Sequence, residues 1–284
     1  MSIKKALTIQ IFLPDGDPFG LRVATETTHV CQVIEIPRLK LPEFANTEES
    51  HRVGVYVLME PGDIDDPLSI YVGQTSDLAT RLQQHNSQKD FWDRAFAIVS
   101  RVNALTQAHS QFLEWMAIQA AKKANRYKLK NANDGTRSHL TASIQAECES
   151  IFSLSSLLFS VLGCRAFEPI LAHVEKDQQC FYCSRLSYRG VAHWTNEGMV
   201  ICAGSKGPSK LTPTCPKGVI KERAKLLNSG IITDNGTCIE FQKEHIAKSP
   251  SAAAAVIQGR SANGWTEWKT KEGKSLDNTI RNRG

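Results

Sequence analysis

The sequence predicts an α+β fold with a short antiparallel sheet, flanking helices and a second small domain. Apolar segments at residues 53–59 and 68–73 have the length of strands, and the turn-rich connection between them is typical of an antiparallel hairpin. Residues 96–102 form a third strand-like segment. Apolar side chains recur at helical spacing over residues 105–124, which predicts a long helix against this sheet.

Shifts in composition and local punctuation divide the 284 residues into five segments. These are an N-terminal β element (1–50), a domain with a three-stranded antiparallel sheet flanked by helices (51–135), a helical linker (136–177) whose helix is expected at 151–162, a small C-terminal α+β domain (178–270) and a flexible tail (271–284). Within the first segment we expect strands at residues 7–13 and 30–36 and a linker at 46–51. The N-terminal element either opens the second segment or is a separate module.

The overall composition is that of a globular protein with a small excess of positive charge. The 34 lysines and arginines exceed the 29 acidic residues by five, which permits a polyanionic partner without requiring one. No apolar run reaches the roughly 20 residues that span a bilayer, and the N-terminus lacks the apolar core of a signal peptide. We therefore expect a cytoplasmic protein with no membrane partner, in which the 8 cysteines are reduced thiols.

A set of polar side chains in the second segment indicates phosphodiester hydrolysis. Tyr56 and Tyr71 lie in the two strands of the expected hairpin, and Arg81 and His85 lie one turn apart in the helix that follows. Glu114 lies beside the apolar stripe of the long helix. A tyrosine can relay a proton from water, an arginine matches phosphate oxygens and one carboxylate can hold Mg²⁺. Each residue alone is typical of packing or of a solvated surface, so it is their order that indicates a site.

This order resembles the GIY-YIG endonuclease family over residues 53–131. The motifs are Gly54-Val55-Tyr56 and Tyr71-Val72-Gly73, followed by an arginine eight residues later, a histidine four residues after that, a helical glutamate and Asn131. Valines replace the isoleucines of both motifs. The connection between the motifs, residues 57–70, is acidic and longer than the resemblance leads us to expect.

The resemblance implies a compact α+β catalytic domain, a divalent metal cofactor, Mg²⁺ or Mn²⁺, and DNA as the substrate. The implied roles are general base (Tyr56 or Tyr71), phosphate stabilisation (Arg81), assistance to proton transfer (His85), metal ligand (Glu114) and positioning of the site (Asn131, with Asn133 as the alternative). Cleavage of both DNA strands by one active site would require a homodimer or two successive nicks.

Two other patterns contain residues that can bind metals. Asp63, Asp65 and Asp66 lie close together, but they lack the ligand spacing and closing glutamate of a calcium loop, so we interpret them as turn residues. Cys180 and Cys183 form a CxxC motif. The further ligands that a zinc site would need are irregularly spaced: His173, His193, Cys202 and Cys215. We interpret the CxxC motif as part of a strand with two buried cysteines.

The C-terminal segment carries a basic run and a second resemblance. The cations of the run are Lys206, Lys210, Lys217, Lys221, Arg223 and Lys225. A solvated face and a patch that binds the DNA backbone explain this run equally well. Gly204-Ser205 and the segments 249–254 and 263–269 resemble an uncharacterised domain that often follows prokaryotic GIY-YIG nucleases, which implies a bacterial protein and partnership with a nuclease.

The sequence therefore predicts a metal-dependent DNA endonuclease with an N-terminal β element and a C-terminal accessory domain. The alternative is a non-catalytic nucleic-acid-binding protein that keeps the nuclease fold. Convergence of Arg81 and Glu114 on one cleft with the tyrosines distinguishes the two. A third hypothesis is an interaction module whose C-terminal domain binds protein.

Overall fold

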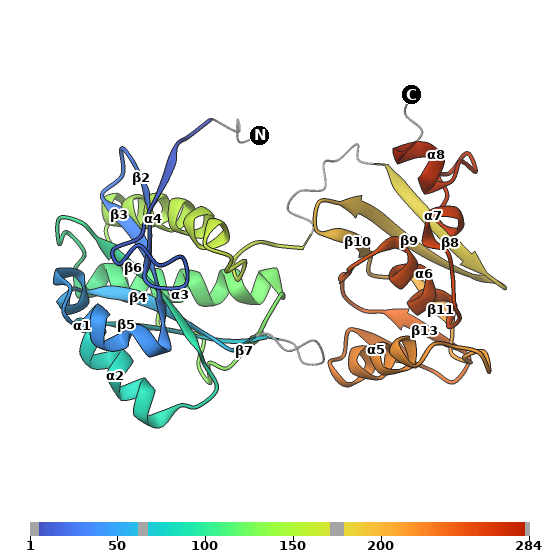
Figure 1. Cartoon of the computed structure of the whole chain (residues 1–284), viewed down its shortest axis with the longest axis horizontal. Coiled ribbons are helices and arrows are strands. Elements are labelled where there is room, and N and C mark those ends of the chain that lie inside the picture. Colours follow the sequence, from blue (N-terminus) through green and yellow to red (C-terminus); the bar gives the residue numbers. More distant parts are fainter. Residues whose placement is uncertain (1–5, 62–67, 171–178, 282–284) are drawn as a thin grey trace. The chain divides into compact units, whose positions relative to one another are not determined.

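The computed structural model of the 284-residue chain describes residues 6–61, 68–170 and 179–281. The chain divides into two compact units, residues 1–169 and 170–284 (Figure 1). Both units mix helices and strands, so the predicted α+β class is confirmed. None of the described helices is long and apolar enough to cross a membrane.

A seven-stranded sheet in the order β1-β2-β3-β6-β4-β5-β7 forms the centre of the N-terminal unit. Its strands are β1 (Ile9–Phe12), β2 (Arg22–Glu26), β3 (Cys31–Pro37), β4 (Gly54–Met59), β5 (Ser69–Thr75), β6 (Arg94–Ser100) and β7 (Lys128–Leu129). The three strands predicted for residues 51–135 are β4, β5 and β6, and they are antiparallel with β4 in the middle. β7 pairs with β5 in parallel.

The N-terminal strands continue this same sheet. β3 pairs with β6 along its whole length, from Cys31 opposite Ser100 to Pro37 opposite Arg94. The strands expected at residues 7–13 and 30–36 correspond to β1 and β3. β2 was not predicted, because its polar ends leave too few apolar residues for a recognisable alternation. Of the two alternatives for the N-terminal element, the strand pairing supports the one in which it opens the following domain.

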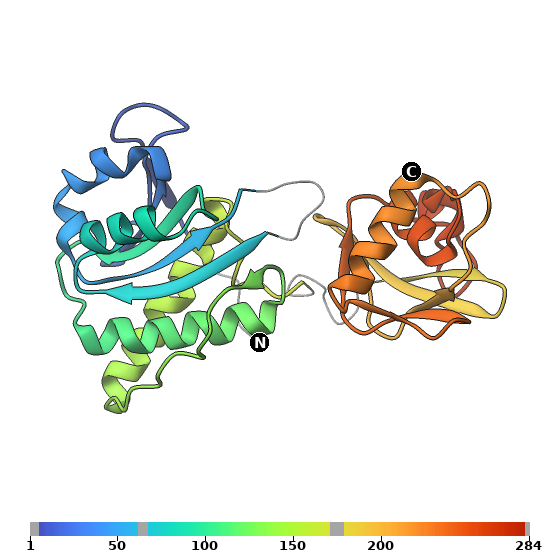
Figure 2. The same ribbon diagram turned by 90° about the horizontal axis from the view of Figure 1, so that it is seen from below.

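Helices cover both faces of this sheet (Figure 2). They are α1 (Leu41–Ala45), α2 (Leu78–Gln88), α3 (Gln107–Ala124) and α4 (Ala142–Val161), with 3₁₀ turns η1 (Arg38–Lys40) and η2 (Glu48–His51). α1 and α2 pack on one face, and α3 and α4 pack on the other. The linker expected at residues 46–51 contains η2. The helix expected from residue 151 begins earlier, at Ala142. Its first half is polar and buries only a thin apolar stripe, so the sequence pattern did not reveal this part of the helix.

Strand alternation separates two cores and fixes the direction of the tyrosines. Val57 belongs to the core under α3 and α4, whereas Tyr56 and Leu58 belong to the core under α1 and α2. Tyr56 lies opposite Gly73 in β5, and Leu58 lies opposite Tyr71. Because opposed residues of paired strands share a face, both tyrosines lie on the face that α2 covers.

The C-terminal unit contains a four-stranded antiparallel sheet in the order β14-β10-β9-β8 and a three-stranded sheet in the order β11-β13-β12. Its elements are β8 (Cys180–Arg185), β9 (Tyr188–Thr195), β10 (Gly198–Ile201), β11 (Lys206–Pro208), α5 (Lys217–Asn228), β12 (Ile232–Asp234), β13 (Cys238–Phe241), β14 (His245–Ala247), α6 (Pro250–Gln258), α7 (Gly264–Glu267) and α8 (Leu276–Ile280). The core of this unit gathers around α6, where Ala253, Ala254 and Ile257 are buried beside Trp268.

Both ends of α6 are capped, and the chain beyond it differs from the expectation. The Ser249 side chain accepts a hydrogen bond from the N–H of Ala252, and Gly259 ends the helix with a φ of 63°. The tail expected to be flexible contains α8, and Leu276 is fully buried. The polar composition of the tail predicted flexibility, because one buried leucine gives no recognisable apolar pattern.

We expect Gly73→Ala to disrupt the pairing of β4 with β5. A Cβ at position 73 would lie 2.3 Å from the hydroxyl oxygen of Tyr56, so the phenol or the strand must move. The expected loss is about 1–3 kcal/mol of unfolding free energy, measured by urea unfolding. Gly218→Ala is the matched control, because a Cβ there meets no atom within 4 Å. Unchanged stability of Gly73→Ala would contradict this account of the Tyr56 site.

Candidate active site

Helix α2 follows β5 directly and carries two of the candidate side chains. Asp77 caps the helix, and its Oδ1 accepts a hydrogen bond from a backbone N–H of the first turn at 2.8 Å. The buried leucines of α2 pack on the sheet, and this orientation turns Arg81 and His85 towards the tyrosines of the strands.

Tyr56, Arg81 and His85 form a hydrogen-bonded cluster. The hydroxyl of Tyr56 lies 2.7 Å from Nε2 of His85, and Nε of Arg81 donates to the same hydroxyl at 3.1 Å. The ring of Tyr71 lies 5.5 Å from the His85 ring and 6.4 Å from the Tyr56 ring, measured between centroids. Four of the predicted residues therefore meet in one place.

Burial and neighbouring charges set the protonation states in this cluster. His85 is only 3% exposed, and burial, reinforced by the charges of Arg81 and Lys89, lowers the pKa of His85 to about 4. The imidazole is therefore neutral at pH 7, with its proton on one of the two ring nitrogens. Burial raises the pKa of Tyr56 well above its ordinary value, although Arg81 opposes this shift.

Glu114 reaches the cluster from α3, which packs on the opposite face of the sheet. Its carboxylate is half-buried, and burial raises the pKa of Glu114, whereas Arg81 and the backbone N–H of Gln74 lower it. The side chain of Gln74 also accepts hydrogen bonds from Gln107 at 2.7 Å and from Ser110 at 3.2 Å. These contacts hold the start of α3 against the end of β5, so Glu114 lies at the edge of the sheet near Arg81.

Asn131 binds the backbone of β5 rather than another side chain. Its Oδ1 accepts from the N–H of Val72 at 2.9 Å, and its Nδ2 donates to the carbonyl of Val72 at 2.8 Å. β7 ends at Leu129, so the Asn131 amide takes the place of the next paired residue of that strand. Asn131 therefore fixes the strand segment next to Tyr71, whereas Asn133 is exposed.

Lys89 also belongs to this site, although the sequence analysis did not identify it. Its Nζ lies 4.6 Å from the centroid of the Tyr71 ring. Lys89 follows His85 by four residues, as His85 follows Arg81, so the three side chains recur at the spacing of one helix face. This spacing is the signal that could have identified it.

Comparison with known families agrees with this geometry. Residues 52–130 match the GIY-YIG catalytic domain. The chain carries a GIY-YIG domain. Residues 181–280 match a domain of unknown function, DUF4357, so the nuclease domain and the accessory domain occur in the predicted order. No curated protein and no solved structure shows significant similarity to the chain.

Among the described residues, Glu114 is the candidate carboxylate for the divalent metal that a GIY-YIG domain leads us to expect. No group of three or more histidine, cysteine or acidic side chains converges within the described parts of the chain. A single carboxylate suits Mg²⁺, which keeps several of its waters when it binds to proteins. A cation would also offset the cost of burying the Glu114 charge. The rival site of three aspartates in the turn lies outside the described residues.

The CxxC motif lies in strand β8, as interpreted, but its two cysteines have different surroundings. Cys183 is fully buried in the core of the C-terminal unit, with Nε2 of Gln258 3.0 Å from its Sγ. Cys180 is half-buried, and its Sγ lies 3.8 Å from Nε2 of His193. Residues three apart in a strand point to opposite faces, so the two thiols cannot form one redox pair.

The predicted basic patch of the C-terminal unit is not one continuous surface. Arg223 is 4% exposed, and its guanidinium donates to backbone carbonyls of residues 208, 209, 256 and 257 at 2.8–3.2 Å. Burial lowers the pKa of Arg223 to about 10. Arg223 is therefore a structural residue that closes the end of α6, and its prediction as a DNA contact is wrong. Lys206 pairs with Glu240 at 3.3 Å. The remaining cations are exposed or half-buried: Lys210, Lys217, Lys221 and Lys225.

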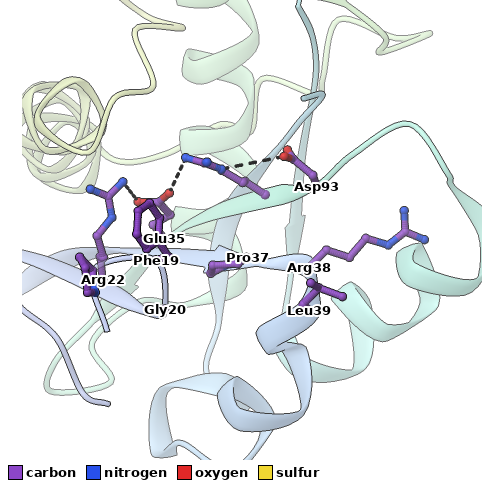
Figure 3. Close-up of a pocket in the computed structure, with 10 residues that line it drawn as sticks. Phe19, Gly20, Arg22, Glu35, Pro37, Arg38, Leu39 and Asp93 are labelled. Carbon is purple, nitrogen blue, oxygen red and sulfur yellow. Dashed lines mark hydrogen bonds and ion pairs between the residues drawn. The ribbon is translucent and has the colours of Figure 1, made fainter. Parts of the chain in front are cut away.

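A cavity of about 540 Å³ lies elsewhere on the N-terminal unit, between β2, β3 and β6 (Figure 3). Glu35, which is 2% exposed, forms ion pairs there with Arg22 and, at 3.2 Å, with Arg94. In Figure 3 Arg38 extends away from Glu35, and its guanidinium donates to Asn86 beyond the end of the cavity. The candidate catalytic side chains do not line this cavity, so it is a separate feature of the GIY-YIG unit.

The low pKa of His85 predicts a specific dependence of stability on pH. An unfolded histidine has a pKa of about 6.5, whereas folded His85 has a pKa of about 4. Between these values only the unfolded chain binds the proton, so stability is full above pH 6.5 and falls as the pH drops towards 4. From pH 7 to pH 5 we expect the wild type to lose about 2 kcal/mol more than His85→Gln.

This difference is measured by urea unfolding of the full chain, with hydrogen exchange of the β4 and β5 amides reporting on the N-terminal unit. His85→Gln is the control for all other titrating groups, which both proteins share. An identical pH dependence in the two proteins would show that His85 is not a buried neutral imidazole.

Proposed function

We propose that this protein is a metal-dependent DNA endonuclease that hydrolyses phosphodiester bonds in its GIY-YIG domain. The supporting observation is the convergence of side chains from separate elements. Tyr56 and Tyr71 come from β4 and β5, Arg81 and His85 come from α2, and Glu114 comes from α3 on the other face of the sheet. A scaffold that only binds nucleic acid does not need a phenol, a guanidinium and a half-buried carboxylate at one edge.

Tyr71 is the stronger candidate for the general base. Tyr56 is 0% exposed, and its hydroxyl already binds both Arg81 and His85. Tyr71 is partly exposed on the same face. A general base must come within hydrogen-bond distance of the attacking water, and this requirement favours Tyr71. Tyr56 then acts as a positioning residue for Arg81.

Arg81 would stabilise the negative charge that grows on the phosphate during hydrolysis. The bond from its Nε to Tyr56 fixes the plane of the guanidinium, and Nε2 of His85 lies within hydrogen-bond distance of the same phenol oxygen. One terminal nitrogen contacts the exposed side chain of Gln84 at 3.1 Å. The terminal nitrogens are the donors that would bind the non-bridging oxygens.

Glu114 would hold the divalent metal, with water completing the coordination. The bound ion would supply charge stabilisation at the leaving oxygen. Mg²⁺ and Mn²⁺ both suit oxygen ligands. One such site lies within the described residues, so cutting both strands of a duplex would require a homodimer or two successive nicks.

The main alternative is a nucleic-acid-binding protein without catalysis. Every catalytic position of the family pattern is filled in this chain, and this favours the nuclease over the alternative. The third hypothesis, an interaction module, concerns only the C-terminal domain and is compatible with nuclease activity.

We expect Glu114→Gln to reduce cleavage at least about 10³-fold, because a metal ion contributes several kcal/mol of charge stabilisation. The test incubates wild type and Glu114→Gln with supercoiled, linear and branched DNA, in Mg²⁺ or in EDTA. Matched melting curves show that the variant is folded. Equal cutting by the two proteins would place the chemistry elsewhere, and DNA binding without cutting by either would support the binding-protein alternative.

A second comparison distinguishes the two tyrosines. We expect Tyr71→Phe to lower the turnover rate by about 10²–10⁴-fold, as removal of a general base does. Tyr56→Phe leaves Tyr71 in place and is expected to have the smaller effect, through a less well oriented Arg81. Single-turnover cleavage with saturating enzyme measures both rates. A larger loss for Tyr56→Phe would assign the base to Tyr56 instead.

A further inference from the structure

Three lysines lie on the strands and helix beside Tyr71, the partly exposed tyrosine of the candidate site. Lys89 lies at the end of α2, with its Nζ over the Tyr71 ring. Lys128 and Lys130 come from β7 and the residue just after it, on the neighbouring strand. Lys128 pairs with Ser69, and the N–H of Lys130 donates to the carbonyl of Ile70.

Lys128 and Lys130 point to the same face of the sheet as Tyr71. Leu129 between them packs into the core under α3 and α4, so its neighbours point to the opposite face. The Nζ of Lys130 lies 4.3 Å from the centroid of the Phe91 ring, and Phe91 packs against the core under α1 and α2. Lys89, Lys128 and Lys130 therefore border one surface around Tyr71, which we call the β7 lysine surface.

This surface has unbalanced positive charge among the described residues. Lys128 and Lys130 are exposed, and Lys89 is half-buried. Among the described residues, the ion pair of this surface joins Lys130 and Glu60, and the distance of 4.0 Å between Nζ and Oε1 is long. Ammonium groups on one surface attract a polyanion, and these groups lie on the same face as the phenol proposed to act on a phosphodiester.

The chemistry of the surface favours phosphates over bases as its ligands. Two aromatic rings that could stack on bases, Tyr71 and Phe91, each carry a lysine ammonium over one face. Lysine is a point charge that binds phosphates without the planar, bidentate geometry that arginine offers to base edges. Phosphate contacts position a nucleic acid but carry no sequence information.

We infer that Lys89, Lys128 and Lys130 bind backbone phosphates of the DNA strand next to the cleaved bond, independently of its sequence. This inference rests on the proposed function, because it makes the β7 lysine surface the substrate path into the GIY-YIG site. It also implies that any preference for a DNA sequence or structure comes from another part of the chain.

The test measures equilibrium binding of the full chain to labelled duplex DNA in EDTA, where metal-dependent cleavage is suppressed, over a range of salt concentrations. Each neutralised phosphate contributes about 0.9 to the slope of log K against log salt. Each single lysine-to-alanine variant should make this slope less negative by about 0.9, and the triple variant by about 2.7. Affinities for two duplexes of unrelated sequence should fall by the same factor, and lysine-to-arginine variants should keep the slope.

Lys123→Ala is the matched control. Lys123 is an exposed lysine of the same unit, and it lies nine residues after Glu114 on α3, which places it half a turn around the helix from the site. Its removal should leave the slope unchanged. An unchanged slope in the triple variant, or a loss of affinity confined to one duplex, would overturn the inference.

The two proposals fail in different ways. If wild type cleaves DNA with metal but the lysine variants bind with an unchanged slope, the nuclease assignment remains and the β7 lysine surface is not the substrate path. If no DNA is cleaved but the slope changes as expected, the surface binds nucleic acid and the nuclease assignment fails.

Discussion

The candidate site depends on one close contact between paired strands. The hydroxyl of Tyr56 lies over Gly73, in the space that the Cβ of any other residue would fill. In that position the hydroxyl accepts a hydrogen bond from Arg81 and is hydrogen-bonded to His85. The same contact places the hydroxyl where it sets the direction of the guanidinium and meets the buried imidazole. The glycine of the second motif is therefore required by the tyrosine of the first, and α2 is oriented by both.

The position of the site at a sheet edge follows from the distribution of its residues over two faces. The tyrosines and α2 share one face, whereas Glu114 belongs to a helix that covers the other. A carboxylate from the far face can reach the tyrosines only around an edge. β5 provides that edge because β7 pairs with only its first residues, and Asn131 satisfies the backbone of Val72 where the pairing stops. An extended β7 would exclude Glu114 from the site.

Local patterns predicted β4, β5, β6, α2 and α3 within residues 51–135 but not the short β7, because alternation and helical spacing report directly on burial only in longer segments. The direction of the tyrosines depended on register, which a slip of one residue reverses, so only the structure fixes it. Arg223 shows the opposite case. It was assigned to a solvated run from its charge, yet Val219, Arg223 and Leu226 recur at the spacing of a buried helix face. The helical spacing indicated that Arg223 is buried, whereas its charge suggested an exposed residue.

The pairing of β3 with β6 has a consequence for the meaning of a domain boundary here. The family match begins at residue 52, within the N-terminal unit and after its first three strands. A fragment cut at that point would remove three strands and leave the seven-residue edge of β6 without a neighbour. Unpaired strand edges are templates for association with other chains. The family match is thus shorter than the compact unit that contains it, and the first 50 residues belong to that unit.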